Sequence, residues 1–164
     1  MRLLLWQSFP VADMLDAVRL QVEDFSVDQE LAALRAGSMR MGGIATFLGC
    51  ARDFSVQDFA TQKLSEECEV SELSFDAYPG MALAVLENLR AEAIEKFKLL
   101  DARIVHRIGT VKAGASIVFI AAGAEHRAPA LQACHWLIDE LKQRAPIWKK
   151  EITPQGEVWV SPHP

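Results

Sequence analysis

The stretch that decides the fold is residues 124–151, AEHRAPALQACHWLIDELKQRAPIWKKE. It predicts the end of a strand, a helix from about Ala128 to Arg144, and another short strand. Pro146 should stop the helix, because proline lacks a backbone donor and clashes with the preceding turn. One face of this helix is apolar and is expected to pack on the core through Ala130, Cys134, Leu137, Ile138 and Leu141.

Cationic side chains stand at both ends of the predicted helix. His126 and Arg127 precede its first turn, while Lys142 and Lys149 lie on either side of Pro146. Helix N-termini attract anions, because free N–H groups and the helix dipole point at them. The stretch therefore suggests a pocket for a small, phosphate-bearing ligand. Taken singly, Lys142 is better explained as an ordinary exposed lysine that the dipole stabilises in the last helical turn. The pocket gains support only because several cationic residues flank the same short elements.

The first hundred residues predict a mixture of strands and helices. Residues 17–22 alternate between apolar and polar, which indicates an edge strand. Ser26 with Gln29 forms a capping box, so a helix should run from about Val27 to Arg35. Gly37 lies just past its end, as a C-terminal glycine should. Residues 44–52 are apolar nearly throughout, and we expect a strand buried on both faces in the middle of a sheet. Arg52 at its end is equally a site residue or simply the first solvated residue.

Residues 53–67 are polar, acidic and without a period, which predicts a loop, and residues 68–76 return as a strand. Pro79 opens a helix whose predicted core stripe is Met81, Val85, Leu89, Ala93 and Phe97. Strands are expected at 102–108 and 116–122, and a hairpin at 147–152 and 158–160. This order predicts an α+β fold with largely antiparallel pairing.

Length and composition favour one domain in a reducing compartment. We expect a single domain over residues 15–164, with residues 1–14 as an N-terminal extension. No apolar run is long enough to cross a membrane, and the cytoplasm is the expected location. The three cysteines form no CxxC pair, and the four histidines show no metal-ligand spacing, so neither disulfides nor a metal site is expected.

Charge is distributed unevenly along the chain. The net charge of −5 argues against general binding of nucleic acid. Residues 1–100 have a net charge of −7, whereas residues 101–164 have +2. Charge alone favours a solvated acidic face with ordinary scatter. The sharper interpretation is that the basic half faces an anionic substrate.

No glycine-rich phosphate loop and no serine nucleophile elbow is present. The candidate chemistry is therefore cationic. A lysine whose pKa is lowered by neighbouring cations can act as a base or a nucleophile, and an arginine can bind phosphate. The candidates are Arg52, His126, Arg127, Lys142, Lys149 and Lys150.

Several ordered motifs over about residues 17–160 resemble the large, catalytic subunit of molybdopterin synthase, the MoaE family. The final block is the most specific, because a proline, tryptophan and two lysines after a lysine-ending helix are hard to meet by chance. The motifs are Gly49-x-x-Arg52, Phe75-Asp76-Ala77-Tyr78-Pro79-Gly80-Met81, His106-Arg107-Ile108-Gly109, His126-Arg127 and Leu141-Lys142-x-x-Ala145-Pro146-Ile147-Trp148-Lys149-Lys150-Glu151.

The resemblance implies an α/β hammerhead-like fold with an additional antiparallel β subdomain. It also implies a reaction: the insertion of two sulfurs into precursor Z, a cyclic pyranopterin monophosphate, to make the dithiolene of molybdopterin. The sulfur comes from the thiocarboxylated C-terminal glycine of a small ubiquitin-like subunit. Two large subunits pair as a homodimer, with a small subunit at each end, and no metal or other cofactor is implied.

The resemblance also implies roles for individual residues. Lys142 matches the lysine central to catalysis, and Lys149 matches the second active-site lysine. Arg52, His126 and Arg127 match substrate-pocket residues. The implied binding segments extend to Cys50 and Ala51 before Arg52, and to Lys150 and Glu151 after Lys149. We read Cys50 as a small strand residue rather than a sulfur carrier, and Cys134 as a packing residue.

Two other functions stay open on the sequence. The chain could be a non-catalytic paralogue that binds the pterin or the ubiquitin-like partner without turnover. The motive for the paralogue is the long acidic loop together with Ala51, Ala77 and Thr110, which depart from the family's usual residues. The chain could also be an unrelated enzyme for a phosphate-bearing ligand, which would not associate with a ubiquitin-like tail.

Overall fold

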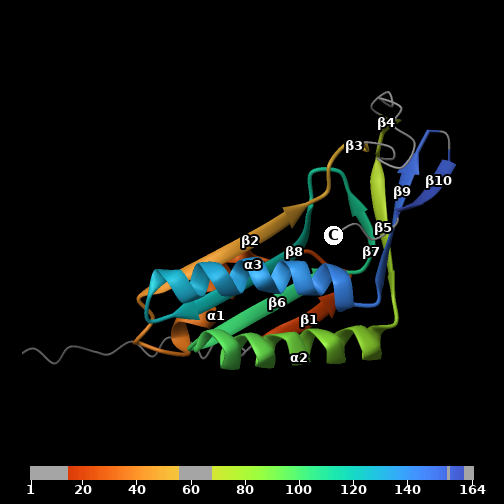
Figure 1. The fold of residues 1–164 in the computed structure, drawn as a ribbon. Helices are drawn as coiled ribbons and strands as arrows, with labels where there is room; N and C mark the ends of the chain where they lie inside the picture. The colour runs from red at the N-terminus through yellow and green to blue at the C-terminus, as the bar shows by residue number, and fades with distance from the viewer. Residues whose placement is uncertain (1–14, 56–67, 155, 161–164) are drawn as a thin grey trace, which may run out of the picture.

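The computed structural model describes residues 15–55, 68–154 and 156–160, and its fold is shown in Figure 1. The predicted extension at residues 1–14 lies outside the described residues. Three helices and ten strands follow the order β1 (Val18–Gln21), α1 (Val27–Ala36), β2 (Gly43–Cys50), β3 (Phe54–Ser55), β4 (Cys68–Glu69), β5 (Glu72–Ala77), α2 (Pro79–Phe97), β6 (Asp101–Arg107), β7 (Gly109–Lys112), β8 (Ser116–Ala124), α3 (Arg127–Arg144), β9 (Ile147–Thr153) and β10 (Gly156–Val160).

The first sheet has the strand order β1-β6-β8-β2. Its β1–β6 pair is parallel, and the other two pairs are antiparallel. The prediction that residues 44–52 form a central strand was wrong, because β2 lies at the edge of this sheet. Its exposure alternates, and Leu48 is 43% exposed. The strand that is buried almost throughout is β8, which has neighbours on both sides.

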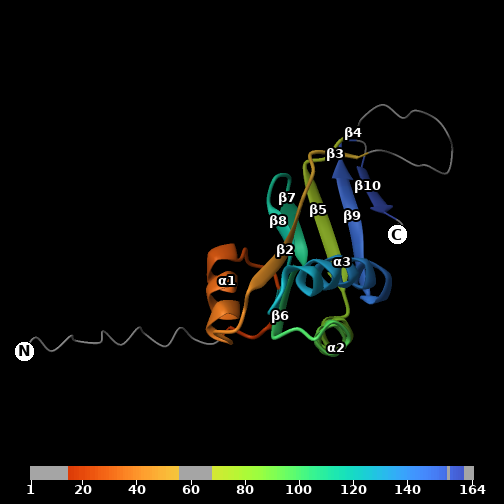
Figure 2. The ribbon, with the colours of Figure 1, turned by 60° about the vertical axis from the view of Figure 1, so that its left-hand side comes forward.

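Helices cover both faces of the first sheet, as Figures 1 and 2 show. On one face, α2 and α3 bury their apolar sides against residues of β2, β6 and β8. On the other face, α1 contributes Leu34 to a smaller cluster with Phe119. The capping box is confirmed, since Ser26 Oγ accepts a hydrogen bond from the Gln29 N–H at 3.4 Å. Double coverage explains why the sheet strands read as continuous apolar runs.

The second sheet is smaller and entirely antiparallel, with the order β10-β9-β5-β7. Two predictions about this region need correction. The expected loop contains β3, which pairs with β4 in a separate two-stranded ribbon, and residues 56–67 of that loop lie outside the described residues. The expected strand at 68–76 is divided into β4 and β5. The predicted hairpin of β9 and β10 is confirmed, as is the α+β class with an added antiparallel sheet.

The predicted core stripe of α2 was only partly correct. Leu89 and Ala93 are fully buried, but Met81 is 62% exposed. A strict spacing of four drifts around a helix that has 3.6 residues per turn, so the stripe leaves the buried face toward its ends. In α3, by contrast, the whole predicted apolar face is buried: Ala130, Cys134, Leu137, Ile138 and Leu141.

A glycine pair sets how closely α3 approaches β2. A Cβ atom at Gly43 would lie 3.2 Å from the Cα of Arg127, and one at Gly42 would clash with the backbone oxygen of Glu125. The first turn of α3 can therefore sit directly against the start of β2. No helix in the described part of the chain is long and apolar enough to span a membrane.

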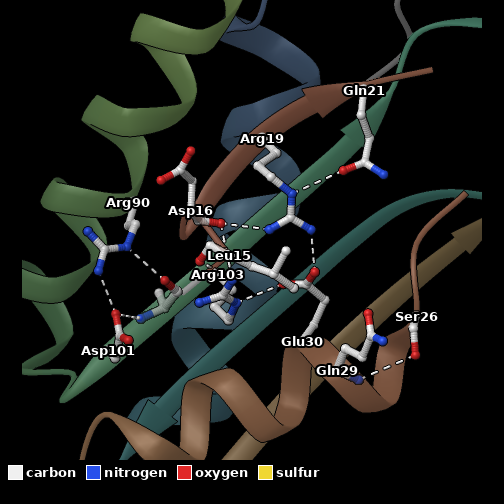
Figure 3. Close-up of polar contacts among 11 residues, drawn as sticks. Leu15, Asp16, Arg19, Gln21, Ser26, Gln29, Glu30, Arg90, Asp101 and Arg103 are labelled. Atoms are coloured by element: carbon white, nitrogen blue, oxygen red, sulfur yellow. Dashed lines mark hydrogen bonds and ion pairs between the residues drawn. The ribbon is translucent and has the colours of Figure 1, made fainter. Parts of the chain in front are cut away.

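A buried ion cluster ties α1 to the first sheet (Figure 3). Glu30 on α1 is 1% exposed and pairs with two arginines, Arg19 on β1 and Arg103 on β6. The Arg103 Nε atom donates to Glu30 Oε2 at 2.7 Å, and its Nη2 atom donates to the backbone oxygens of Leu15 and Asp16. The cluster thus connects a helix, two strands and the segment before β1.

Replacing the shared carboxylate should destabilise the fold. In the Glu30→Gln variant, two partly or fully buried guanidinium groups lose their counter-charge, and we expect a loss of about 3 kcal/mol in the free energy of unfolding. Urea denaturation measures this loss. The exposed Glu87→Gln variant on α2 is the matched control and should change stability by less than about 0.5 kcal/mol. Equal stability of both variants would show that the cluster does not hold α1 in place.

Candidate functional site

The junction between α3 and β9 carries the two lysines singled out by the sequence. Lys142 is exposed in the last turn of α3. The helix ends where the Ala145 N–H donates to the Leu141 carbonyl, and the Ile147 N–H donates to the Ala145 carbonyl. Pro146 lies between these two bonds, so the chain enters β9 directly. Lys142 and Lys149 are thereby held on two adjoining rigid elements.

Lys149 points to the inner face of the second sheet. It lies directly opposite Phe75 of β5, and Phe75 is buried. The Lys149 Nζ atom lies 3.0 Å from Glu151 Oε1, and its side chain is 31% exposed. Glu151 lies two residues further on the same face, opposite buried Leu73, and is itself 7% exposed. A buried carboxylate therefore fixes one side of a lysine whose ammonium still reaches solvent.

Arg52 borders the same inner face. The residue before it, Ala51, is 3% exposed and packs in a small cluster with Val70, Leu73, Phe75 and Val111. Ala51 is thus a core residue whose side chain anchors the end of β2. Arg52 is exposed, and its guanidinium lies 5.2 Å from the centre of the Phe54 ring. Cys50, at the end of β2, is also exposed.

His106 lies behind Phe75, at the point where β6 leads into the second sheet. The two rings meet edge to face, with centroids 5.4 Å apart. Burial lowers the pKa of His106 to about 4, and its Nδ1 lies 2.6 Å from the Arg107 carbonyl oxygen. The imidazole is therefore neutral at pH 7 and serves as packing behind the site. The sequence marked His106 as part of a motif but not as a buried neighbour of Phe75.

The structure does not bring His126 and Arg127 to the lysines within one chain. Both are exposed at the N-terminal end of α3, whereas Lys142 is in its last turn. This separation is about 22 Å along the helix axis. Figure 1 shows that β2 runs alongside α3, from the His126 end toward the Lys142 end. Within one chain, Lys142 and Lys149 flank the junction of α3 and β9 and Arg52 follows the end of β2, whereas His126 and Arg127 lie at the other end of α3.

Lys150 lies on the opposite face of β9 from Lys149, because side chains alternate along a strand. Its Nζ atom is 2.8 Å from Glu157 Oε2 and 5.0 Å from the centre of the Trp159 ring. The hydrogen bond with Glu157 raises the pKa of Lys150. The structure therefore places Lys150 apart from Lys149.

Arg52, Lys142 and Lys149 can bind anions and stabilise negative charge. No set of three or more histidine, cysteine or acidic side chains in the described ranges could hold a metal ion. Cys134 faces the core as predicted, and burial raises the pKa of its thiol to about 11, so the thiol stays protonated. Cationic side chains are therefore the chemically active groups that this end of the fold presents.

Comparison with known proteins identifies relatives of this chain. Residues 20–144 match the family model described as "MoaE protein". A relative from Pseudomonas aeruginosa, named molybdopterin synthase catalytic subunit, is 39% identical over 144 residues, which cover 88% of this chain and 89% of that protein. A protein of the same name from Pyrococcus abyssi is 38% identical over 138 residues, covering 84% and 85%.

Solved structures show the same fold. The molybdopterin biosynthesis MoaE protein from Burkholderia ambifaria superposes with a TM-score of 0.73 at 37% identity and covers 90% of both chains. The molybdopterin synthase from Staphylococcus aureus superposes with a TM-score of 0.72 at 28% identity, covering 87% of this chain and 95% of that one. The sequence match and the shared fold agree, and the chain belongs to the MoaE protein family.

Proposed function

We propose that this chain is the catalytic subunit of a molybdopterin synthase. It transfers sulfur from the thiocarboxylated Gly-Gly terminus of a small ubiquitin-like subunit to precursor Z, and so forms the dithiolene of molybdopterin. The observation that carries the proposal is that Lys142 and Lys149 flank the junction of α3 and β9 in a chain whose relatives are named for this activity. No metal ion or other cofactor takes part in the proposed step.

The chemistry explains why the site is cationic. Precursor Z carries a phosphate, the sulfur donor carries a negative thiocarboxylate, and sulfur transfer passes through charged tetrahedral species. Fixed ammonium and guanidinium groups stabilise all three, and more strongly where water is partly excluded. Lys142 is exposed at the helix end, so it can meet both the incoming tail and the pterin. Arg52, with its planar guanidinium, suits the phosphate.

Glu151 supports Lys149 in this proposal. Its buried carboxylate holds the Lys149 ammonium at 3.0 Å, on the inner face of the second sheet. This assigns Glu151 to positioning a catalytic group, although the resemblance alone grouped it with the substrate-binding residues. A charged group owes a large part of its catalytic effect to being held in the correct position.

His126 and Arg127 enter the site only from a second copy of the chain. The free edge of β2 is available for that copy, and a groove of about 450 Å³ between β2 and α3 adds apolar surface. If two β2 strands pair antiparallel, the start of one lies beside the end of the other. His126 lies near the start of β2 and Arg52 at its end, so this pairing would bring the partner's His126 toward the lysines.

Loss of Lys142 should abolish the reaction without unfolding the protein. Because its side chain is exposed, the Lys142→Ala variant should fold normally and lose about 100-fold or more in rate. The measurement is single-turnover formation of molybdopterin from precursor Z and a thiocarboxylated small subunit. The exposed Lys112→Ala variant is the control and should keep its activity. Full turnover by Lys142→Ala would overturn the assignment, and tight partner binding without product from the wild type would favour the non-catalytic paralogue.

Glu151 and Lys149 should behave as one unit. We expect Glu151→Gln to lower the rate constant about tenfold, since the carboxylamide keeps the shape but loses the charge that holds Lys149. In the Lys149→Ala background, the same Glu151→Gln change should have almost no further effect. Single-turnover rates of the two single variants and the double variant form the cycle. Additive losses would instead give Glu151 a role independent of Lys149.

Two defective variants should restore each other if the site spans two copies. A Lys142→Ala chain and a His126→Ala/Arg127→Ala chain should each be nearly inactive alone. Mixed dimers contain one intact site, so a random mixture should recover about a quarter of the wild-type rate. The assay is molybdopterin formation after the chains are mixed and allowed to exchange. A mixture no more active than the separate variants would place all of the residues in sites within single chains.

A further inference from the structure

The two lysines of the proposed site belong to parts of the fold that are built on different sheets. Lys142 is on α3, which packs on the first sheet, whereas Lys149 is on β9 of the second sheet. Catalytic groups act together only when each is held in the correct position. Besides the short link at Pro146, the spacing of the two ammonium groups therefore depends on what fixes the second sheet against the first.

The chain passes from the first sheet to the second through a bend between β6 and β7. Arg107, the last residue of β6, pairs with Gln21 of β1, and Gly109, the first residue of β7, pairs with Phe75 of β5. Gly109 has a φ of +75°, a left-handed conformation that glycine adopts without strain. Phe75 also pairs with Lys149 on the other side of β5. Within the second sheet, Phe75 thus lies between the bend and the lysine.

His106 reaches Phe75 from the first sheet. It is on the same face of β6 as Ile104, the face that α2 and α3 cover, and it is 5% exposed. Its ring meets the Phe75 ring edge to face, at a centroid distance of 5.4 Å and an interplanar angle of 79°. Among the described residues, this is the one contact between two aromatic rings that joins the two sheets. We call this pair of side chains the joint.

A hydrogen bond to the bend holds the imidazole of the joint in place. The Arg107 carbonyl oxygen can only accept, so the His106 Nδ1 atom, 2.6 Å away, carries the proton and donates. Arg107 is itself anchored to the first sheet and its edge, because its guanidinium donates to the backbone oxygens of Val22 at 3.1 Å and Ser116 at 3.2 Å. The ring that contacts Phe75 is thus tied to backbone that the first sheet fixes.

The chain from α3 to β9 crosses between the same two packed regions. Ala145 packs against the core cluster of the first sheet, and Ile147 packs against the cluster that contains Phe75. Lys149 follows Ile147 by two residues and is on the same face of β9. A shift of Phe75 against the first sheet would therefore move the strand that carries Lys149, while Lys142 would stay with α3.

We propose that His106 is a positioning residue for Lys149: through Phe75 it fixes the second sheet against the first and so sets the spacing of Lys149 from Lys142. This rests on the proposed function, because it takes the two lysines from that function. His106 does not touch the substrate and exchanges no proton with it. Its contribution is the geometry of the joint.

The first test is the rate of molybdopterin formation by variants of the joint. His106→Leu removes the ring and the donor, and it should lower the rate constant at saturating precursor Z about tenfold with little change in the half-saturating concentration. His106→Phe keeps a ring against Phe75 and should stay within about threefold of wild type. In the Lys149→Ala background, His106→Leu should have almost no further effect. Ile104→Val, at an equally buried position on the same face of β6, is the matched control and should keep the wild-type rate.

The second test reads the position of β9 without any substrate. Fluorine NMR of the chain labelled with fluorotryptophan follows Trp148, which precedes Lys149 in β9, and Trp136, which is on α3. We expect His106→Leu to shift or broaden the Trp148 signal and to leave the Trp136 signal unchanged. His106→Phe and Ile104→Val should leave both signals close to their wild-type positions.

Three results would overturn the proposal: a wild-type rate for His106→Leu, an equal loss of rate in the Lys149→Ala background, or an unchanged Trp148 signal. If His106→Leu does not fold, Phe75→Leu removes the same contact from the second sheet and is measured in its place, with the same expected results. The NMR signals need no turnover, and wild-type turnover is read separately. A failure of the joint is therefore distinguishable from a failure of the proposed reaction.

Discussion

The rest of the structure depends on the burial of one face of α3 against the first sheet. Six side chains of this helix are buried, and the glycine pair before β2 lets its first turn approach the strand closely. A helix packed along its whole length is a rigid rod, and its ends are then held a known distance apart. This constraint sets Lys142 at one end of the fold and His126 at the other. The end of α3 also leads the chain directly into β9, the strand of the second sheet that carries Lys149.

The two faces of the second sheet carry different sets of side chains. Its inner face packs on the small cluster around Ala51 and Phe75 and carries Lys149 with its buried partner Glu151. Its outer face carries rings and an ion pair that is satisfied within the chain. Because side chains alternate along β9, consecutive residues point to opposite faces: Lys149 lies on the inner face beside Glu151, and Lys150 lies on the outer face beside Glu157. A single strand thereby carries one lysine of the proposed site and one lysine that is paired away from it.

Part of the site could be predicted from local sequence. The apolar face of α3 and the proline after it indicated the helix correctly, and the lysines flanking that proline were identified from it. The separation of His126 from Lys142 could also be predicted from the sequence, because a helix of the predicted length keeps its ends more than 20 Å apart. Local periodicity did not reveal that Ala51 is core, or that His106 packs behind Phe75. Those contacts join residues far apart in the chain.

The sequence by itself determined the three helices, most of the strands, the cationic ends of α3 and the family, since each depends on short-range patterns. Only the tertiary structure decided the strand order. An edge strand covered by a helix and a central strand both read as apolar runs, so the sequence predicted a central place for β2. Which face of β9 points inward was likewise decided by the partners of β5 and by the cluster around Ala51. The physical reason is that the order of the strands, and the face that each strand turns inward, are set by burying together segments that are far apart in the chain. Local residue preferences do not include the free energy of that burial.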